Sequence, residues 1–299
     1  MEKPGFKSKT IKSIIRRKID KWLESITDEA LRARVAQGTI VTGGCIVSML
    51  MGEEVNDFDI YLRDHDTLHA LAEYYVELFR PKCTREINVL DEEGRVRIVV
   101  KSDGFVKDKD TKDPEDEVIT DTADIEDAYQ ETEKKALETK DEAKPKHLPV
   151  FLTTNAITLK GKIQIIVRFW GEPDKIHENY DFVHCTSYWT SWDNELVLRP
   201  AALEAILSRE LRYVGSKYPV CSLVRVRKFV QRGWRINAGQ LVKMAMQISK
   251  LDLEDFKVLE DQLTGVDTAY FMQLIEAVRE KDPARVDSAY LLEIVDRIF

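Results

Sequence analysis

The chain has 299 residues, of which 43% are hydrophobic and 33% are charged, and its formal net charge is −8. This length suits one or two domains with packed cores, and the apolar fraction is ordinary for a soluble globular protein. No run of about 18 apolar residues occurs, and the basic N-terminus lacks the apolar core of a signal peptide, so we expect a cytoplasmic protein without a membrane-spanning helix.

The first 63 residues predict a helix, a strand, a second helix and a second strand. Residues 10–35 predict one amphipathic helix, because apolar side chains recur at three- and four-residue spacing: Ile11, Ile14, Ile15, Ile19, Trp22 and Leu23. Residues 38–44 (GTIVTGG) predict a short buried strand that ends in a glycine turn, and CIVSMLMG predicts a helix closed by Gly52. Residues 56–63 (NDFDIYLR) predict a strand whose two faces alternate: Phe58, Ile60 and Leu62 on one, Asp57, Asp59 and Tyr61 on the other.

The next segments predict a helix, a hairpin and an insertion. Residues 66–80 predict an amphipathic helix that stops before Pro81, and residues 85–90 and 95–100 predict a hairpin that turns at DEEG. Residues 103–146 contain 16 acidic and 8 basic residues, an excess that equals the net charge of the whole chain. We expect a disordered, solvated insertion there, with transient helix near 124–140. Because the rest of the chain is then neutral, the acidic balance does not exclude a nucleic-acid partner.

After this insertion the chain predicts two more strands and then only helices. VFLTTNAITLKG and KIQIIVRFWG predict two strands joined by a turn at Gly161. From residue 199 onward, helices are predicted over AALEAILSRELRYVG, SLVRVRKFVQRG, AGQLVKMAMQISKL, DLEDFKVLEDQL, TAYFMQLIEAVREK and RVDSAYLLEIVDRIF; the first ends at Gly215 and the second at Gly233. We therefore divide the chain into an N-terminal helix (1–38), a head built on a sheet (39–198) and a helical C-terminal domain (199–299).

The segment with the clearest chemistry is TGGCIVSMLMGEEVNDFDIYL, residues 42–62. Gly43 and Gly44 end a strand and begin a helix, where backbone N–H groups can approach a phosphate closely. Asp57 and Asp59 lie one residue apart on the next strand, so both carboxylates point to the same side and can share divalent metal ions. An isolated Asp-x-Asp is usually a solvated strand face. Here the order and spacing of the two features indicate a site for a nucleoside triphosphate and a metal ion.

This arrangement resembles the signature of the polymerase-β nucleotidyltransferase superfamily. Residues 41–60, VTGGCIVSMLMGEEVNDFDI, are similar to the LxGGxVRDxLLGxxxxDxDI motif of bacterial poly(A) polymerases and class II CCA-adding tRNA nucleotidyltransferases. YDFVHCTSYW (180–189) falls where that family carries RDFTINAMAY, and the resemblance is collinear over about residues 39–240. The whole chain also resembles tailed-phage proteins described as nucleotidyltransferases, which implies a location in the host cytoplasm. The implied fold is α+β: a polymerase-β-type head with a mixed sheet, followed by a helical C-terminal domain.

The chain departs from this family at several motif positions. The Arg and Asp of the family's VRD correspond to Val47 and Ser48, and that Arg helps to hold the triphosphate. The EDxxR triplet, which selects C and A in CCA-adding enzymes, would fall at Tyr218, Pro219 and Ser222. These differences argue against CCA addition.

The third carboxylate that the family carries on a neighbouring strand is also missing, because KIQIIVRF offers Gln164 there. Asp181 is the residue kept from the family's RRDxxxN pattern, and it is either a substitute catalytic carboxylate or a structural one behind the site. Asp57 and Asp59 are the expected catalytic ligands of Mg²⁺ or Mn²⁺. Two carboxylates can still hold a metal ion with help from triphosphate oxygens, so the resemblance continues to imply activity.

Further residues are expected to hold the substrate. In a nucleotidyltransferase, Gly43 and Gly44 would hold the β- and γ-phosphates of an NTP, while Arg168, Arg225 and Lys228 would neutralise the triphosphate or the acceptor. Eight cations lie within 27 positions: Arg209, Arg212, Lys217, Arg225, Arg227, Lys228, Arg232 and Arg235. This density predicts either a phosphate-binding surface for RNA or a solvated helix face.

The remaining candidate residues have more ordinary interpretations. His177 and His184 flank Asp181 but form no hydrolase triad, so we expect surface or supporting roles. Three aromatic residues could stack a base or could belong to the core: Tyr188, Trp189 and Trp192. The cysteines form no C-x-x-C pair, which excludes a zinc site or a disulfide framework and predicts buried free thiols at Cys45, Cys185 and Cys221.

Three functions remain open from the sequence. The first is a metal-dependent enzyme that transfers a nucleotide from an NTP to an RNA 3′ hydroxyl and releases pyrophosphate. The second uses the same head on a protein side chain or a small molecule. The third is a catalytically degenerate head that serves as a binding or structural module of a phage.

Overall fold

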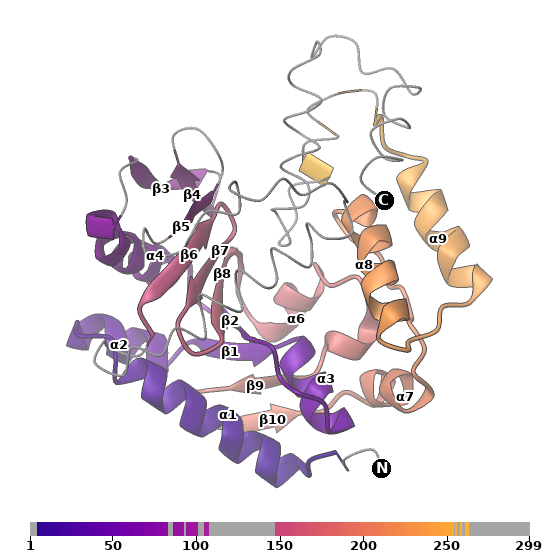
Figure 1. Cartoon of the computed structure of the whole chain (residues 1–299), viewed down its shortest axis with the longest axis horizontal. Coiled ribbons are helices and arrows are strands. Elements are labelled where there is room, and N and C mark those ends of the chain that lie inside the picture. Colours follow the sequence, from indigo (N-terminus) through magenta and orange to yellow (C-terminus); the bar gives the residue numbers. More distant parts are fainter. Residues whose placement is uncertain are drawn as a thin grey trace, which may run out of the picture.

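The computed structural model describes residues 5–82, 86–92, 94–100, 105–107, 147–253, 255, 258, 261 and 262. It combines helices with a mixed eight-stranded sheet and a separate two-stranded sheet, so the predicted α+β class is confirmed (Figure 1). Within these ranges no helix is both long and apolar enough to span a membrane.

The large sheet has the strand order β10-β9-β1-β2-β8-β7-β6-β5, and the small one pairs β3 with β4. In chain order the strands are β1 (Thr39–Thr42), β2 (Phe58–Leu62), β3 (Ile87–Glu92), β4 (Arg95–Val100), β5 (Phe105–Lys107), β6 (Pro149–Thr153), β7 (Ala156–Leu159), β8 (Ile163–Trp170), β9 (Tyr188–Thr190) and β10 (Glu195–Val197). Only β2 and β8 pair in parallel among the described strands; the other pairs are antiparallel. Each of these two strands is paired along both of its edges, so the backbone that carries their polar side chains is fixed in the sheet.

The helices are α1 (Ser8–Leu23), α2 (Glu29–Ala36), α3 (Gly44–Met51), α4 (His65–Phe79), α6 (Pro173–His177), α7 (Pro200–Ser208), α8 (Pro219–Gln231) and α9 (Ala238–Ile248). Figure 1 shows α1 along one side of the sheet, and α8 and α9 beside each other at the far end of the molecule. The predictions of α3 with Gly52 at its C-terminus, of α4, of the β3–β4 hairpin and of α9 are confirmed.

The prediction of one helix over 10–35 is wrong, because the chain forms α1 and α2 with a break between them. The side chain of Asp28 accepts a hydrogen bond from Leu31 N at 2.9 Å and so starts the second helix. The apolar face of α1 is buried as expected, and its side chains join the core beneath the sheet: Ile11, Ile15, Ile19 and Trp22.

The strand predicted over VFLTTNAITLKG is two strands, β6 and β7, that form a tight hairpin. The hydroxyl of Thr153 accepts hydrogen bonds from Asn155 N at 3.3 Å and from Ala156 N at 2.9 Å. These local bonds reverse the chain where the apolar pattern continues. The predicted turn at Gly161 is confirmed, with φ of +90°.

The predicted insertion is wrong at its start, because Phe105–Lys107 form β5 and pair with β6. The remainder, 103–104 and 108–146, lies outside the described residues, as does the predicted transient helix near 124–140. The helices predicted beyond residue 251 also lie outside them, apart from positions 252, 253, 255, 258, 261 and 262.

The helix predicted up to Gly215 ends earlier, at Ser208. Arg209 adopts a left-handed conformation with φ of +50°, which terminates α7. The chain then runs in extended form, and Tyr213 forms a β-bridge with Phe182. Helix α8 ends at Gln231, two residues before the predicted Gly233.

A second apolar cluster joins the helices to the head. It contains one buried residue of α3 (Val47), buried residues from α7, α8 and α9 (Ile206, Val226 and Met244), and Phe182, Leu211, Tyr213 and Trp234 from the connecting segments. Through this cluster α8 is packed against the chain that leads from the glycine turn, which fixes the distance between α8 and β2.

Candidate active site

The predicted glycine turn connects β1 to α3 and touches Asp59. Gly43 has φ of +90°, a conformation that favours glycine, and its N–H donates to the carbonyl of Cys185 at 3.2 Å. A Cβ at this position would lie 3.0 Å from Oδ2 of Asp59 and 3.5 Å from the hydroxyl of Tyr180. Glycine is therefore required both by the backbone and by the carboxylate beside it.

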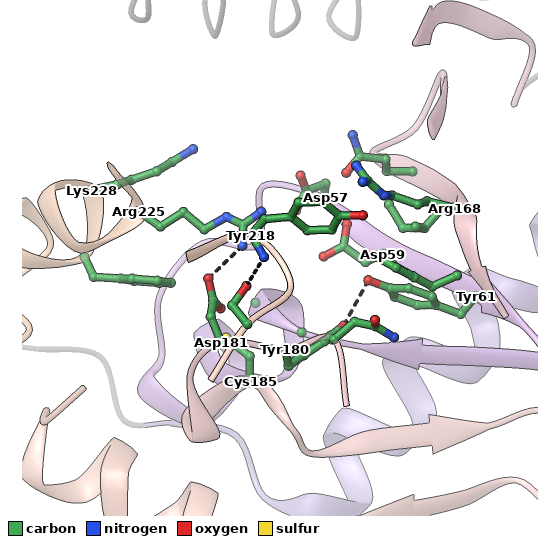
Figure 2. A pocket seen from close by; sticks show the side chains of 18 of the residues that line it. Asp57, Asp59, Tyr61, Arg168, Tyr180, Asp181, Cys185, Tyr218, Arg225 and Lys228 are labelled. Atoms are coloured by element: carbon green, nitrogen blue, oxygen red, sulfur yellow. Dashed lines mark hydrogen bonds and ion pairs between the residues drawn. The ribbon is translucent and has the colours of Figure 1, made fainter. Parts of the chain in front are cut away.

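Asp57 and Asp59 reach the same cavity, as Figure 2 shows. Asp59 lies on β2 opposite Thr42 of β1, and Asp57 lies immediately before the strand. The cavity has a volume of about 260 Å³. It is lined by Gly43, Gly44, Asn56, Asp57, Asp59, Tyr61, Gln164, Ile166, Arg168, Phe169, Asn179, Tyr180, Asp181, Cys185, Ser216, Tyr218, Arg225, Lys228, Phe229 and Arg232.

Gln164 lies directly beside Asp59. The parallel pairing of β2 and β8 makes these two residues Cα partners, so their side chains emerge on the same face of adjacent strands. Gln164 lines the cavity with Asp59. The neighbouring strand thus contributes a neutral amide at the position where the sequence analysis expected Gln164 instead of a carboxylate.

Arg168 lines the cavity further along β8 and is almost completely buried, with 3% of its surface exposed. Its guanidinium stacks on the ring of Tyr218 at 3.9 Å from the ring centroid, and Nη2 lies 3.7 Å from Oδ1 of Asp261. Burial lowers the pKa of Arg168 from its ordinary value, yet a guanidinium stays protonated in proteins. The cavity therefore has a fixed positive charge held by an aromatic ring.

The opposite wall of the cavity is one face of α8, continued by Arg232 just after the helix ends. Arg225, Lys228, Phe229 and Arg232 recur at spacings of three and four residues and all line the cavity. In Figure 2 the side chains of Arg225 and Lys228 extend from α8 toward the carboxylates. Arg225 and Lys228 were predicted to bind the substrate and Phe229 was not, although the helical spacing of these four residues is visible in the sequence.

Asp181 is in the cavity but is engaged by α8. Nη1 of Arg225 lies 2.7 Å from Oδ2 of Asp181, whose side chain is 12% exposed. This ion pair compensates the charge of the carboxylate and ties the head to α8. The contact favours the structural alternative for Asp181 over a direct role in holding metal.

Two tyrosines, the buried Tyr61 and the half-buried Tyr180, line the cavity beside Asp59. The hydroxyl of Tyr180 donates to the hydroxyl of Tyr61 at 3.2 Å. Burial, reinforced by the nearby carboxylate of Asp59, raises the pKa of Tyr61 well above its usual range. Burial likewise raises the pKa of the Cys185 thiol. These groups therefore stay neutral, and the charge at this end of the cavity belongs to the carboxylates.

His177 and His184 lie outside this cavity and are buried. Nε2 of His177 is 2.8 Å from the hydroxyl of Thr42, which itself donates to the carbonyl of Ser187 at 2.9 Å. Burial lowers the pKa of both His177 and His184 to about 4, so both are neutral at physiological pH. Their predicted supporting role fits this burial, whereas a position on the surface does not.

The aromatic residues considered for base stacking also lie elsewhere. Trp189 is fully buried in the core, and Trp192 packs against the guanidinium of Arg63 at 4.9 Å. Neither lines the cavity, nor does Tyr188. Five other aromatic residues line it: Tyr61, Phe169, Tyr180, Tyr218 and Phe229. Tyr218 lies just before α8, and Phe229 lies on α8.

The eight-residue basic cluster divides in the structure. Arg225, Lys228 and Arg232 face the cavity. Arg212 pairs with Glu204, Arg209 lies 3.9 Å from Glu53, and Arg235 donates to the carbonyl of Ser208. The cluster is therefore not one continuous surface but a cavity wall together with cations that hold neighbouring segments.

Asp57 and Asp59 provide the hard oxygen donors that Mg²⁺ and Mn²⁺ prefer, and the adjoining amides of Asn56 and Gln164 line the same cavity. The donor set therefore fits one divalent cation. In the described part of the chain no group of three or more His, Cys, Asp or Glu residues is arranged to hold a metal ion.

Solved structures with a similar fold are CCA-adding enzymes. The Thermotoga maritima CCA-adding enzyme complexed with tRNA has a TM-score of 0.41 and 12% sequence identity, over 93% of this chain and 68% of that one. The Bacillus stearothermophilus CCA-adding enzyme in complex with CTP has a TM-score of 0.38 and 13% identity, over 90% of this chain and 53% of that one.

Sequence comparison identifies a phage relative. The chain is 24% identical over 178 residues to the protein "Gabija anti-defense 2" of Bacillus phage SPbetaL7, a match that covers 58% of this chain and 43% of that protein. The chain thus spans less than half the length of this curated relative. Residues 13–209 match the model of the Gabija anti-defense 2 protein family, which is about two thirds of the sequence. The chain therefore belongs to the Gabija anti-defense 2 family.

Proposed function

We propose that this protein is a metal-dependent nucleotidyltransferase that moves a nucleotide from an NTP to an acceptor hydroxyl. One observation carries the proposal: the carboxylates of Asp57 and Asp59 face the cationic side of α8 across a cavity of about 260 Å³. A polyphosphate needs both features, because a divalent cation held by carboxylates and fixed side-chain cations neutralise different oxygens.

In this proposal each wall of the cavity has a separate task. Asp57 and Asp59 would hold Mg²⁺ or Mn²⁺, which when bound neutralises developing charge on the phosphoryl oxygens. Gly44, the first residue of α3, would offer its backbone N–H to the β- and γ-phosphates, because the N–H of Gly43 already donates to the carbonyl of Cys185. Arg168, Arg225 and Lys228 would bind the remaining oxygens. The acceptor oxygen forms a bond to the α-phosphorus while the bond to pyrophosphate breaks, and the acceptor proton passes to solvent.

The proposed acceptor is the 3′ hydroxyl of an RNA. Residues 39–198 would form the catalytic head, and residues 199–299 would position the acceptor. Exposed Lys217 and Arg227 lie on the same segment as the cavity cations and support binding of a phosphate backbone. A protein hydroxyl or a small molecule is the second acceptor class, and the family name supports it, because a counter-defence protein could act on a defence protein.

The family name also supports a biological role, in which the transfer acts against the Gabija defence of the host. The expected result is that a phage sensitive to Gabija plates efficiently on cells that carry Gabija and express the wild-type protein. Cells that express Asp57→Asn/Asp59→Asn should remain protected. Equal plating with both proteins would mean that the counter-defence role does not depend on transfer.

The first test of transfer is incubation with Mg²⁺ and each α-³²P-labelled NTP, with and without total RNA. The products are separated on denaturing RNA and protein gels. The expected result is label in RNA that Asp57→Asn/Asp59→Asn abolishes. Asp66→Asn, an exposed carboxylate on α4 outside the cavity, is the matched control and should keep full activity.

The other outcomes of this assay identify the alternatives. Label in protein alone would assign the second acceptor class. The absence of label from a folded protein would favour a binding module, which the neutral amide of Gln164 beside Asp59 supports. Such a module would still bind NTP in a manner that depends on Mg²⁺ and Asp57.

A further inference from the structure

We infer that the site holds a single protein-bound divalent cation, and that Gln164 is the residue that keeps a second one from binding. This inference rests on the proposed function, because it assumes that Asp57 and Asp59 bind metal. It goes further by fixing the number of ions and naming the residue that sets it.

The geometry places Gln164 where a second ion would need a ligand. Asp59 and Gln164 are Cα partners in the parallel pair of β2 and β8, and adjacent strands lie about 4.8 Å apart. An ion that bridged this pair of side chains would meet one carboxylate and one amide. An amide oxygen can coordinate a divalent cation, but it has no charge to offset that of a second ion.

The charges around the cavity lead to the same conclusion. Asp57 and Asp59 together carry two negative charges, which match one divalent cation. The third carboxylate of the cavity, Asp181, already forms an ion pair with Arg225 at 2.7 Å. Arg168 adds a buried positive charge to the same cavity. Two divalent cations 3.5–4 Å apart, the usual spacing of two-metal sites, would therefore repel each other without enough carboxylate to compensate.

Arg168 also explains how the cavity can accept a polyphosphate with one ion. Its guanidinium is fixed by stacking on Tyr218 at 3.9 Å and is permanently charged, so it supplies positive charge without a second metal. Any further ion would then enter with the polyphosphate, coordinated by phosphate oxygens.

The test is the stoichiometry of Mn²⁺ binding to the full chain without nucleotide, measured by electron paramagnetic resonance of free Mn²⁺ and by calorimetry. We expect one Mn²⁺ for the wild type, none for Asp57→Asn/Asp59→Asn, and two for Gln164→Glu, which changes the amide to a carboxylate of the same shape. Gln164→Asp is a second variant if Gln164→Glu fails to fold. Gln37→Glu adds the same charge outside the cavity and should bind one ion.

Each other outcome overturns the inference. Two ions, or none, on the wild type contradict the single-cation site, and one ion on folded Gln164→Glu and Gln164→Asp contradicts the role of Gln164. The transfer assay reports separately on the proposed function. One bound ion without transfer activity would contradict the proposed function and support the single-cation site. Two bound ions with transfer activity would support the proposed function and contradict the single-cation site.

Discussion

At the scale of single residues, the site depends on close contacts that leave little freedom for substitution. Gly43 is bounded by its positive φ and by Oδ2 of Asp59, whereas a Cβ on the next residue, Gly44, would meet nothing within 4 Å. Glycine is therefore required at position 43 by conformation and contact, whereas the space around position 44 would accept a side chain.

Gly43→Ala should lower the free energy of unfolding by about 1–3 kcal/mol, the usual cost of a non-glycine residue in a strained conformation. It should also weaken Mn²⁺ binding, because the new methyl group displaces the carboxylate of Asp59. Urea denaturation and Mn²⁺ titration measure the two effects. Gly44→Ala is the matched control for stability and should leave it unchanged within about 0.5 kcal/mol, since alanine is favoured within a helix. Equal losses in both variants would contradict this explanation.

The buried histidines make the fold sensitive to acid. His184 is 1% exposed among aromatic rings, with Trp234 at 4.2 Å between centroids, and burial lowers its pKa to about 4. Between pH 6.5 and 4 the unfolded chain binds a proton that the folded chain does not. The stability from this neutral ring is thus complete above pH 6.5 and is lost as the pH falls toward 4.

We expect His184→Phe to reduce the difference in unfolding free energy between pH 7 and pH 4.5 by roughly 2 kcal/mol, because it removes one titrating group. Urea denaturation at both pH values measures this difference. The carboxylates titrate in both proteins and cancel in the comparison. An unchanged pH dependence would show that His184 is not the group responsible.

At the scale of elements, α8 presents two different faces. Lys228 of α8 and Arg232, which directly follows the helix, line the cavity, while exposed Arg227 of α8 does not. The position of a cation on the helix therefore decides its role. Those that line the cavity can bind a phosphate there, and the others contact only solvent or an external partner.

Removing cavity cations should weaken NTP binding, and removing Arg227 should not. We expect Lys228→Ala and Arg232→Ala each to raise the Kd for a non-hydrolysable NTP with Mg²⁺ by about tenfold, the effect of losing one hydrogen bond to a charged group. Calorimetry measures the affinity, and Arg227→Ala is the matched control. A similar loss of affinity in all three variants would mean that NTP binding depends on the total positive charge of this region and not on contacts within the cavity.

The elements that repeat a periodic pattern could be predicted from sequence, as could the ends marked by Gly52 and Gly161, but other ends could not. The face of β2 and the apolar stripe of α4 follow from spacing alone. The errors at Asp28, Thr153 and Arg209 each arise where one side chain or one backbone conformation ends an element while the apolar pattern continues. Such local terminators are weak signals beside periodicity.

In the site, too, contacts between residues close in sequence could be predicted and contacts between distant segments could not. The proximity of Gly43 to Asp59 could be predicted because one stretch of 24 residues, 39–62, contains both strands and the turn. The stacking of Arg168 on Tyr218, and the approach of α8 to β2, join segments that are distant in sequence. They depend on how the second apolar cluster packs, which no local pattern specifies.

At the scale of the whole molecule, the chain beyond α9 returns to the site. Asp261 lies 3.7 Å from the guanidinium of Arg168, and Gln262 is held by the carbonyl of Lys217 at 2.9 Å. Asp261, which is distant in sequence, thus lies beside Arg168, the cation that we propose binds phosphate.

Because this carboxylate competes with phosphate for Arg168, Asp261→Asn should lower the Kd for an NTP by a few-fold. Calorimetry at two salt concentrations measures the change, which should shrink at high salt because screening weakens both interactions. Asp255→Asn, another carboxylate of the same segment, outside the cavity, is the matched control. A higher Kd in Asp261→Asn would show that Asp261 instead positions Arg168 for the substrate.

The parallel pairing of β2 with β8 also has a consequence for synthesis on the ribosome. One hundred residues separate Leu62 from Ile163, and at about 5–20 residues per second their translation takes roughly 5–20 s. Throughout that time β2 can pair with β1 alone, and its other edge is open to the apolar segments of neighbouring chains. The nascent protein therefore passes through a period in which one edge of β2 is unpaired, before β8, which carries Gln164 and Arg168, has been made.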